Sequence, residues 1–352
     1  MSLRKRLPYV LAVSALLATA TGAGEAAACS KSSWTGGETE VCRGTWVYRD
    51  YVYDDYGASR PTGAQKAWPS LSAQTGDDRY PDELENSADL LGVEMRIRRG
   101  RLWLRFPLSA LYRGDETIAA LAVDHTPGRG GGQWPGLKVA SDGWDDVHLF
   151  RKGDPKRNEI RGSIPLPPGK QWRVQAVAAQ ADGTVMNVAF RGTSEGGTWW
   201  EDKQAAALAA GDISEFGATV RASDMTKKRT RPAALKPGFY ERVYRSDFTI
   251  GERGEGYTYA GVPGRAGEAP AFGQEYNFLG RHQPYGIYVP KGGAPHGLQL
   301  VMHGYSAAHA SLVEAQGMSR TSARPATGSS WCRSAAARPA STPTTASATC
   351  ST

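Results

Sequence analysis

Two adjacent runs of alternating side chains constrain the fold of this chain most strongly. Apolar and charged residues alternate over 93–98, and apolar residues alternate with Arg and Trp over 101–106. Arg99 and Gly100 separate the two runs and suit a tight turn. Successive side chains on a strand point to opposite faces, so each run presents one apolar face. The sequence therefore predicts a β-hairpin with one buried face.

Similar short runs continue through the middle of the chain. Further strands are predicted at 117–123, 172–178 and 185–191, with turn-rich segments between them. An Ala-rich segment, 200–210, is followed by Gly211 and predicts one helix. Several short strands with one helix favour a β-sandwich over a βαβ fold. We therefore predict a mainly β chain, with a β-sandwich over residues 44–225.

The first 28 residues have the three parts of an export signal. A basic stretch, Arg4–Arg6, precedes an apolar stretch, Leu7–Ala20, that is too short to span a bilayer, and small residues follow at Ala26–Ala28. We expect a signal peptide over 1–28, a secreted product, and no membrane attachment after cleavage. The alternatives are an uncleaved membrane anchor and a lipoprotein modified at Cys29.

Export also bears on the first two cysteines. Disulfides form and persist in oxidising compartments, so Cys29 and Cys42 are expected to form a disulfide that staples residues 29–43. The competing interpretation is two free thiols.

The formal net charge of +7 raises the question of a nucleic-acid partner. Much of the excess lies at the two ends: residues 1–28 hold three basic residues against Glu25, and residues 319–352 hold four arginines and no acid. The chain between them is almost balanced. A basic surface of the kind that binds nucleic acid is therefore not expected.

Acidic and aromatic residues are dense in the predicted sandwich. Asp77, Asp78 and Asp89 are weak candidates for a calcium site, because Ca²⁺ takes six to eight oxygen ligands. The favoured alternative is a solvated acidic surface, so no cofactor is expected. Exposed aromatic residues would stack on sugar rings, although most are expected in the core. The aromatic residues considered are Tyr51, Tyr53, Tyr56, Tyr80, Trp103, Trp134, Trp144 and Trp172.

Two short segments carry a resemblance to a known module. They are Asp-Tyr-Val-Tyr-Asp-Asp-Tyr-Gly at 50–57, and Gly-Asp-Asp-Arg-Tyr-Pro at 76–81 leading to Ala-Asp-Leu at 88–90. They resemble the sandwich module at the C-terminal end of glucodextranases, which also occurs in front of secreted actinobacterial hydrolases. The resemblance implies an accessory role in binding polysaccharide or cell-surface glycan.

A second domain is predicted after a polar linker at 226–236. Within residues 237–318, a strand-like segment, Gln283–Pro290, precedes an apolar run, Leu298–Met302, that leads directly into His303 and Gly304. This arrangement resembles the third strand and oxyanion turn of α/β-hydrolases, particularly secreted esterases and the prolyl-oligopeptidase group.

The hydrolase resemblance also assigns roles in the turn. It implies that Gly304, Tyr305 and Ser306 border the oxyanion hole and that His303 is a structural neighbour. The expected architecture is a β-sandwich domain followed by an incomplete α/β-hydrolase domain.

The nucleophile of such a hydrolase is not found after the oxyanion turn. No Gly-x-Ser-x-Gly motif follows Ser306, and the match at 192–196, centred on Ser194, precedes the turn and is interpreted as a glycine-rich turn. The sequence therefore predicts a truncated, inactive hydrolase. The alternatives are a non-catalytic sandwich that binds glycan and an enzyme that uses Ser194.

Residues 319–352 differ in composition from the rest of the chain. They contain no Leu, Ile, Val, Asp, Glu or Lys, and nearly all are Ser, Thr, Ala, Arg, Pro or Gly. We interpret them as a low-complexity tail from another reading frame. With GC-ending codons over 321–333, a shifted frame encodes Val-Leu-Val-Val after a polar stretch. The alternative is a genuine Ser/Thr/Pro-rich linker or glycosylated stalk.

Overall fold

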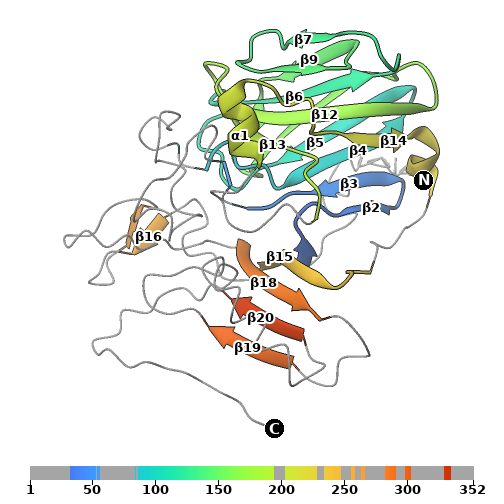
Figure 1. Ribbon diagram of the computed structural model, residues 1–352. Helices are drawn as coiled ribbons and strands as arrows, with labels where there is room; N and C mark the ends of the chain where they lie inside the picture. Colours follow the sequence, from blue (N-terminus) through green and yellow to red (C-terminus); the bar gives the residue numbers. More distant parts are fainter. Residues whose placement is uncertain are drawn as a thin grey trace, which may run out of the picture.

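The computed structural model shows a mainly β protein, as predicted (Figure 1). One α-helix is present among the residues that the structure describes. The described residues are 32–52, 54–55, 84, 86–193, 203–227, 234–246, 255–257, 263–265, 282–290, 298–302 and 329–333.

One antiparallel sheet has six strands in the order β10-β11-β5-β4-β3-β2. In chain order the strands are β2 (Thr39–Cys42), β3 (Thr45–Arg49), β4 (Gly92–Arg98), β5 (Arg101–Pro107), β10 (Gly153–Asp154) and β11 (Glu159–Pro165).

A second antiparallel sheet follows the order β13-β12-β6-β9, and a further strand, β14, also pairs with β12. Its strands are β6 (Thr117–Asp124), β9 (Asp146–Phe150), β12 (Gln171–Gln180), β13 (Val185–Val188) and β14 (Ala218–Arg221). A small pair, β7 (Gly131–Gln133) and β8 (Ala140–Asp142), and a 3₁₀ helix, η4 (Ala222–Thr226), complete this part.

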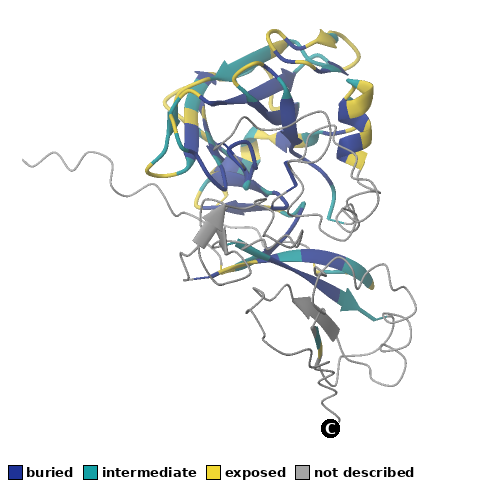
Figure 2. Ribbon diagram, turned by 90° about the vertical axis from the view of Figure 1, so that its left-hand side faces the viewer, coloured by how far each residue is buried: buried dark blue, intermediate teal, exposed yellow. Residues whose placement is uncertain are grey.

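These two sheets pack face to face and enclose the main core. Alternate residues of β5 and β12 enter one continuous apolar cluster, which includes Leu104, Phe106, Trp172 and Val174. Figure 2 shows buried residues concentrated in the strands of the two sheets, with many of the exposed residues at the turns between them. The alternation in the sequence therefore produces a two-sheet sandwich, because each strand can bury only one face against its partner sheet.

The predicted hairpin is confirmed as β4 and β5. Arg99 and Gly100 have φ values of 50° and 70°. Positive φ at both central residues is typical of the two-residue hairpin turn whose twist matches that of the flanking strands. The strands predicted at 117–123 and 172–178 are confirmed as β6 and β12. The strand predicted at 185–191 ends earlier, at Val188, and Phe190 adopts a φ of 70° that an extended strand does not allow.

The predicted helix is confirmed as α1 (Lys203–Ala210), which ends just before Gly211. Its Ala207 and Leu208 belong to an apolar cluster that also contains Val177 and Ile118 of the second sheet and Trp134. This face of the second sheet is therefore covered. No helix in the described part of the chain is long and apolar enough to cross a membrane.

A third sheet has the order β1-β15-β18-β20-β19. Its strands are β1 (Ser33–Thr35), β15 (Gly238–Arg245), β18 (His282–Val289), β19 (Leu298–Met302) and β20 (Ser329–Arg333). All neighbours are antiparallel except β19 and β20, which are parallel. A separate hairpin consists of β16 (Glu255–Tyr257) and β17 (Pro263–Arg265).

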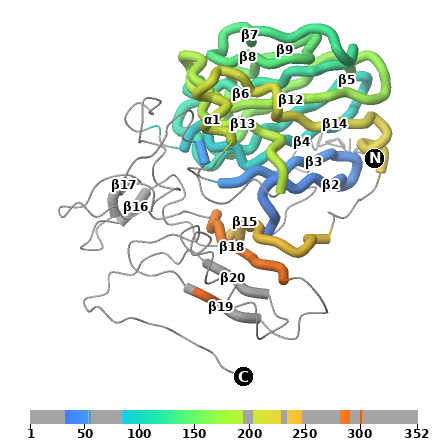
Figure 3. Tube along the Cα trace, in the orientation of Figure 1, coloured from blue at the N-terminus to red at the C-terminus, as the bar shows by residue number. Residues whose placement is uncertain are grey.

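The N-terminal segment links the sandwich to the third sheet. The chain enters through β1 at the edge of β15 and continues into β2 at the edge of the six-stranded sheet (Figure 3). The described part of residues 237–318 contains strands and no helix, so the predicted α/β-hydrolase domain is not shown. One strand of this sheet, β20, lies within the segment predicted as a low-complexity tail.

Candidate functional site

Most residues that the sequence singled out lie outside the described part of the chain. These are Cys29, Asp77, Asp78, Ser194, Gly304, Tyr305 and Ser306. Their predicted roles in a disulfide, a calcium site and an oxyanion hole stay predictions. Of the residues predicted to form the disulfide, the calcium site or the oxyanion hole, Cys42 and Asp89 are described.

Cys42 is the last residue of β2 and is buried. Its sulfur takes part in a disulfide. Because Cys29 is outside the described residues, the pairing of Cys29 with Cys42 stays a prediction.

Asp89 is fully buried, in the segment that leads into β4. Its carboxylate accepts a hydrogen bond from the hydroxyl of Ser109, and its backbone carbonyl accepts one from the amide of Ser109 at 2.9 Å. Asp89 therefore ties two loops of the sandwich together. Among the described residues, no three His, Cys, Asp or Glu side chains gather in a way that would hold a metal ion.

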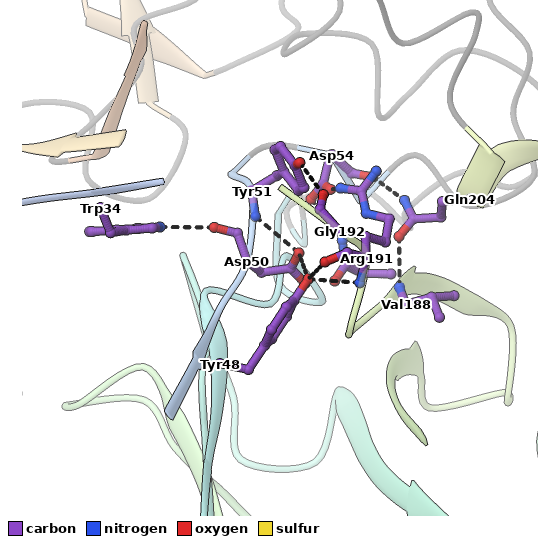
Figure 4. Close-up of polar contacts among 10 residues, drawn as sticks. Trp34, Tyr48, Asp50, Tyr51, Asp54, Val188, Arg191, Gly192 and Gln204 are labelled. Atoms are coloured by element: carbon purple, nitrogen blue, oxygen red, sulfur yellow. Dashed lines mark hydrogen bonds and ion pairs between the residues drawn. The ribbon is translucent and has the colours of Figure 1, made fainter. Parts of the chain in front are cut away.

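The described residues of the segment 50–57 take part in a buried polar cluster (Figure 4). We call it the Asp50 cluster; its members are Tyr48, Asp50, Asp54, Arg191 and Gln204. The hydroxyl of Tyr48 donates to Oδ1 of Asp50 at 3.0 Å, and the backbone N–H of Arg191 donates to the same hydroxyl at 3.0 Å. The backbone N–H of Tyr51 also donates to Oδ1 of Asp50, at 2.9 Å.

An ion pair and the helix complete the cluster. The guanidinium of Arg191 pairs with the carboxylate of Asp54 and lies over the ring of Tyr51, 4.4 Å from its centroid. Gln204, on α1, donates to the backbone carbonyl of Asp54 and accepts from the backbone N–H of Val188, both at 2.7 Å. The side chain of Gln204 thus fastens the helix to β13 and to the motif segment.

Burial dominates the electrostatics of this cluster. Asp50 is fully buried, and burial raises the pKa of its carboxyl to about 7 against the nearby charge of Arg191, which lowers it. Burial also raises the pKa of Tyr48. All five members are nine-tenths or more buried. The cluster therefore connects the segment 50–55 to β13 and α1 inside the protein. We do not assign it a ligand.

The outer face of the six-stranded sheet offers a more accessible surface. We call it the Arg–Trp face. It consists of outward residues of β4, β5 and β11, namely Glu94, Arg96, Arg98, Arg101, Trp103, Arg105, Arg161 and Ser163. Strand pairing places these residues in rows across the sheet. Arg96, Trp103 and Ser163 form one row, and Arg98 stands opposite Arg101 in the next.

One end of the Arg–Trp face is neutralised by ion pairs. Arg105 contacts Glu94, with Nη1 2.6 Å from Oε1, and also pairs with the buried carboxylate of Glu159. Glu159 in turn lies 2.6 Å from Nε of Arg161. Burial would lower the pKa of Arg105, but the two carboxylates outweigh it and raise that pKa. Arg105, on β5, is therefore held in place by ion pairs to β4 and β11.

The other end of the face exposes an indole beside arginines. Trp103 is 46% exposed, and its Nε1 donates to the backbone carbonyl of Arg98 at 3.2 Å, which orients the ring. Arg101 donates from Nε to the hydroxyl of Ser163 at 3.0 Å and from Nη2 to the Ser163 carbonyl at 2.9 Å. An oriented aromatic ring beside a fixed guanidinium can stack on a ring and bind an acid.

The sequence named Trp103 among eight aromatic residues without selecting it. The alternation of apolar and polar residues along β5 could have identified Trp103 as an exposed residue. Leu102 and Leu104 face the core, so Trp103 between them must face outward. Of the other aromatic residues in that set, Tyr51, Trp134 and Trp172 are buried, as expected for core residues.

Comparison with known proteins gives little guidance. No protein-family model matches the chain, and no curated protein matches it. One similar solved structure is an endonuclease/exonuclease/phosphatase from Beutenbergia cavernae, with 19% sequence identity over 28% of this chain and a TM-score of 0.19. The match covers 22% of that structure. A likeness of this size carries no argument about fold or function.

Proposed function

We propose that this chain is a secreted protein of the serine-hydrolase type, related to peptidases and esterases, in which an accessory β-sandwich precedes the first strands of an α/β-hydrolase domain. The observation that carries the proposal is the parallel pairing of β19 with β20. Parallel neighbours require a crossover connection of a dozen or more residues, and residues 303–328 are long enough to supply it.

The place where β19 ends supports the same proposal. β19 ends at Met302, immediately before His303 and Gly304. In open α/β sheets, ligands bind beyond the carboxyl ends of the strands. Backbone N–H groups after Gly304 would then stabilise a developing oxyanion, in the role that Gly304, Tyr305 and Ser306 are expected to border.

The position of β20 supports the interpretation of residues 319–352 as out of frame. With GC-ending codons the shifted frame would encode Val-Leu-Val-Val within 328–332, and β20 spans Ser329–Arg333. An apolar strand at this place would suit a buried parallel sheet better than the Ser-Ser-Trp-Cys-Arg of the present sequence. Sequencing the DNA across the codons for 317–333 tests this interpretation, and an unshifted read would contradict it.

We expect no serine-hydrolase turnover from the chain as written, because no Gly-x-Ser-x-Gly motif follows Ser306. The test is labelling of the purified chain by a fluorophosphonate probe, with an active serine esterase as positive control. Labelling at any serine would overturn the expectation. Loss of that label in Ser194→Ala would assign it to the glycine-rich turn at 192–196.

A second candidate function is glycan binding by the sandwich without catalysis. The exposed Trp103 on the Arg–Trp face favours it, because an aromatic ring on a flat sheet can stack on a sugar ring. The test is retention of the full chain on insoluble polysaccharides. Trp103→Ala should abolish retention, whereas Tyr244→Ala, at an aromatic residue 39% exposed on β15, should retain it. Equal retention of both variants would exclude the Arg–Trp face.

A further inference from the structure

We propose that Asp50 makes the docking of the third sheet on the sandwich sensitive to pH. The third sheet docks more tightly while the carboxyl group of Asp50 is protonated and more weakly once that group is ionised. Neither proposed function is involved, since the docking of these two parts is a property of the fold.

Asp50 lies where β1 of the third sheet meets the sandwich. Its backbone carbonyl accepts a hydrogen bond from Nε1 of Trp34 on β1 at 2.9 Å (Figure 4). Its backbone N–H donates to the carbonyl of Leu91, just before β4, at 3.1 Å. Val52, two residues further on, belongs to the apolar cluster of Trp34 and Val243 of β15. A movement of this segment would therefore break contacts that hold the third sheet.

The two oxygens of the Asp50 carboxyl group differ in their hydrogen bonds. Oδ1 accepts from the hydroxyl of Tyr48 and from the backbone N–H of Tyr51, at 3.0 and 2.9 Å. Oδ2 is buried and has no hydrogen-bond partner in the part of the chain that the structure describes. Burial without hydrogen bonds penalises a charged carboxylate far more than a neutral acid. The folded protein therefore favours the protonated form of Asp50.

The charged and titratable groups around Asp50 act in both directions. Burial has the largest effect and raises the pKa of Asp50, and the buried Asp89 before β4 raises it further. Arg191, whose guanidinium also pairs with Asp54, lowers this pKa, and so do the hydrogen bonds from Tyr48 and from the amide that follows Asp50. The balance is a pKa of about 7, so Asp50 changes its charge near neutral pH.

Docking and ionisation are linked through this difference in pKa. Once the third sheet separates, the segment that follows β3 can move towards water, and the pKa of Asp50 falls towards its ordinary value near 3.8. The docked state therefore holds the proton more tightly than the separated state. Docking should be strongest below about pH 4, weaken as the pH rises through about 7, and change little above that.

A second titratable side chain at this contact is His282 of β18. Its ring lies edge-on to the indole of Trp34, with the ring centroids 5.7 Å apart. Histidine side chains also change charge between pH 5 and 8. Arg49 lies 5.7 Å from the centroid of the same indole and pairs with Glu40, and guanidinium groups keep their charge over this range. The experiment must therefore separate Asp50 from His282.

Hydrogen exchange of the full chain at pH 5 and pH 8, corrected for the intrinsic exchange rate, measures docking. The amides of β15 should exchange through a smaller opening than those of β5, with lower protection and a weaker dependence on urea. Protection of β15 should fall by at least about tenfold from pH 5 to pH 8, because the linkage amounts to about tenfold for each pH unit below the folded pKa.

Variants assign this pH dependence to one side chain. In Asp50→Asn the protection of β15 should differ by less than about twofold between the two pH values, because the amide does not titrate. Tyr48→Phe removes a hydrogen bond that lowers the pKa of Asp50, so the midpoint of the pH dependence should move upwards. His282→Gln and the surface variant Asp212→Asn should behave like the parent chain.

Several results would overturn the proposal. Equal protection of β15 at both pH values would show that Asp50 does not affect docking. Loss of the pH dependence in His282→Gln, with its retention in Asp50→Asn, would assign it to the histidine. Equal protection and urea dependence in β15 and β5 would show that the third sheet does not separate on its own. If Asp50→Asn does not fold, an unshifted midpoint in Tyr48→Phe contradicts the proposal.

Discussion

The indole Nε1 of Trp34 donates a hydrogen bond to the backbone carbonyl of Asp50 at 2.9 Å. Trp34 lies on β1, which pairs with β15 in the third sheet, whereas Asp50 directly follows β3 of the sandwich. The same indole packs with Val52 and Val243. One buried tryptophan therefore joins the two parts of the molecule through a hydrogen bond and an apolar contact.

Trp34→Ala should weaken the third sheet more than the sandwich. Removing a buried tryptophan side chain costs about 3–5 kcal/mol, and here the loss falls on the contact with β15. Hydrogen exchange should show loss of protection in β15 and β18, with β5 and β6 retained. Tyr244→Ala, at an exposed residue of β15, serves as the control. Equal loss of protection in all four strands would contradict the prediction.

Asp50→Asn should remove part of the pH dependence of stability. Burial raises the pKa of Asp50 from its ordinary value near 3.8 to about 7, so the folded state holds this proton more tightly than the unfolded state. The stabilisation is fully present below about pH 4 and is lost as the pH rises towards and past 7. The parent chain should therefore lose more stability between pH 5 and pH 8 than the variant.

The amide imitates the protonated acid, because its oxygen can still accept from the hydroxyl of Tyr48 and the amide of Tyr51. Urea unfolding at pH 5 and pH 8 measures the effect. Asp212→Asn is the control: Ser214 hydrogen bonds lower the pKa of Asp212, so that carboxyl does not titrate in this range. A variant with the same pH slope as the parent would show that Asp50 does not cause it.

Gln175→Leu should destabilise the sandwich by about 2–4 kcal/mol. The amide of Gln175 donates to the carbonyls of Ile213 and Phe216 at 3.0 and 2.8 Å and accepts from the hydroxyl of Ser141 at 2.8 Å, all in buried surroundings. Leucine would leave these groups unsatisfied, which costs more than the bonds contribute. Thermal unfolding measures the loss. Gln171→Ala, at an exposed position on the same strand, should change stability by less than about 0.5 kcal/mol.

Gly92→Ala should destabilise the chain, whereas Gly100→Asn should be tolerated. A Cβ at residue 92 would lie 2.2 Å from the backbone oxygen of Tyr48, and the φ of +154° is unfavourable for a side chain. At residue 100 the surrounding space is open, and asparagine tolerates positive φ. Denaturation should show a loss of more than about 1 kcal/mol for the first variant only. Similar losses in both variants would point to a common effect of removing glycine.

Many of the strands of the sandwich could be predicted from the local alternation of apolar and polar residues. The alternation of Val93 and Met95 against Glu94 and Arg96 determines which side of β4 faces the core, and this is a property of the strand alone. The strands of 131–165 were harder to predict because β7, β8 and β10 are two or three residues long, and β7 and β10 contain glycine. Such short segments become strands through pairing, which the local sequence does not encode.

The candidate sites were predicted less well for a physical reason. The motif at 50–57 reads as an exposed acidic and aromatic segment, yet Asp50 and Asp55 are fully buried. Asp54 of the same segment is held by Arg191 and Gln204, which lie more than a hundred residues away along the chain. The Arg–Trp face depends likewise on the register of β11 against β5. Contacts between distant segments determine both surfaces.

The pairing of β1 with β15 also has a consequence for biosynthesis. Residues 33–35 leave the ribosome well before residues 242–244, their partners in the sheet. At ~5–20 residues per second, the interval is roughly 10–40 s. During that time the sandwich strands can already assemble, while Trp34 still lacks its contact with Val243. A chaperone that shields short apolar segments would therefore have to bind the chain during this interval.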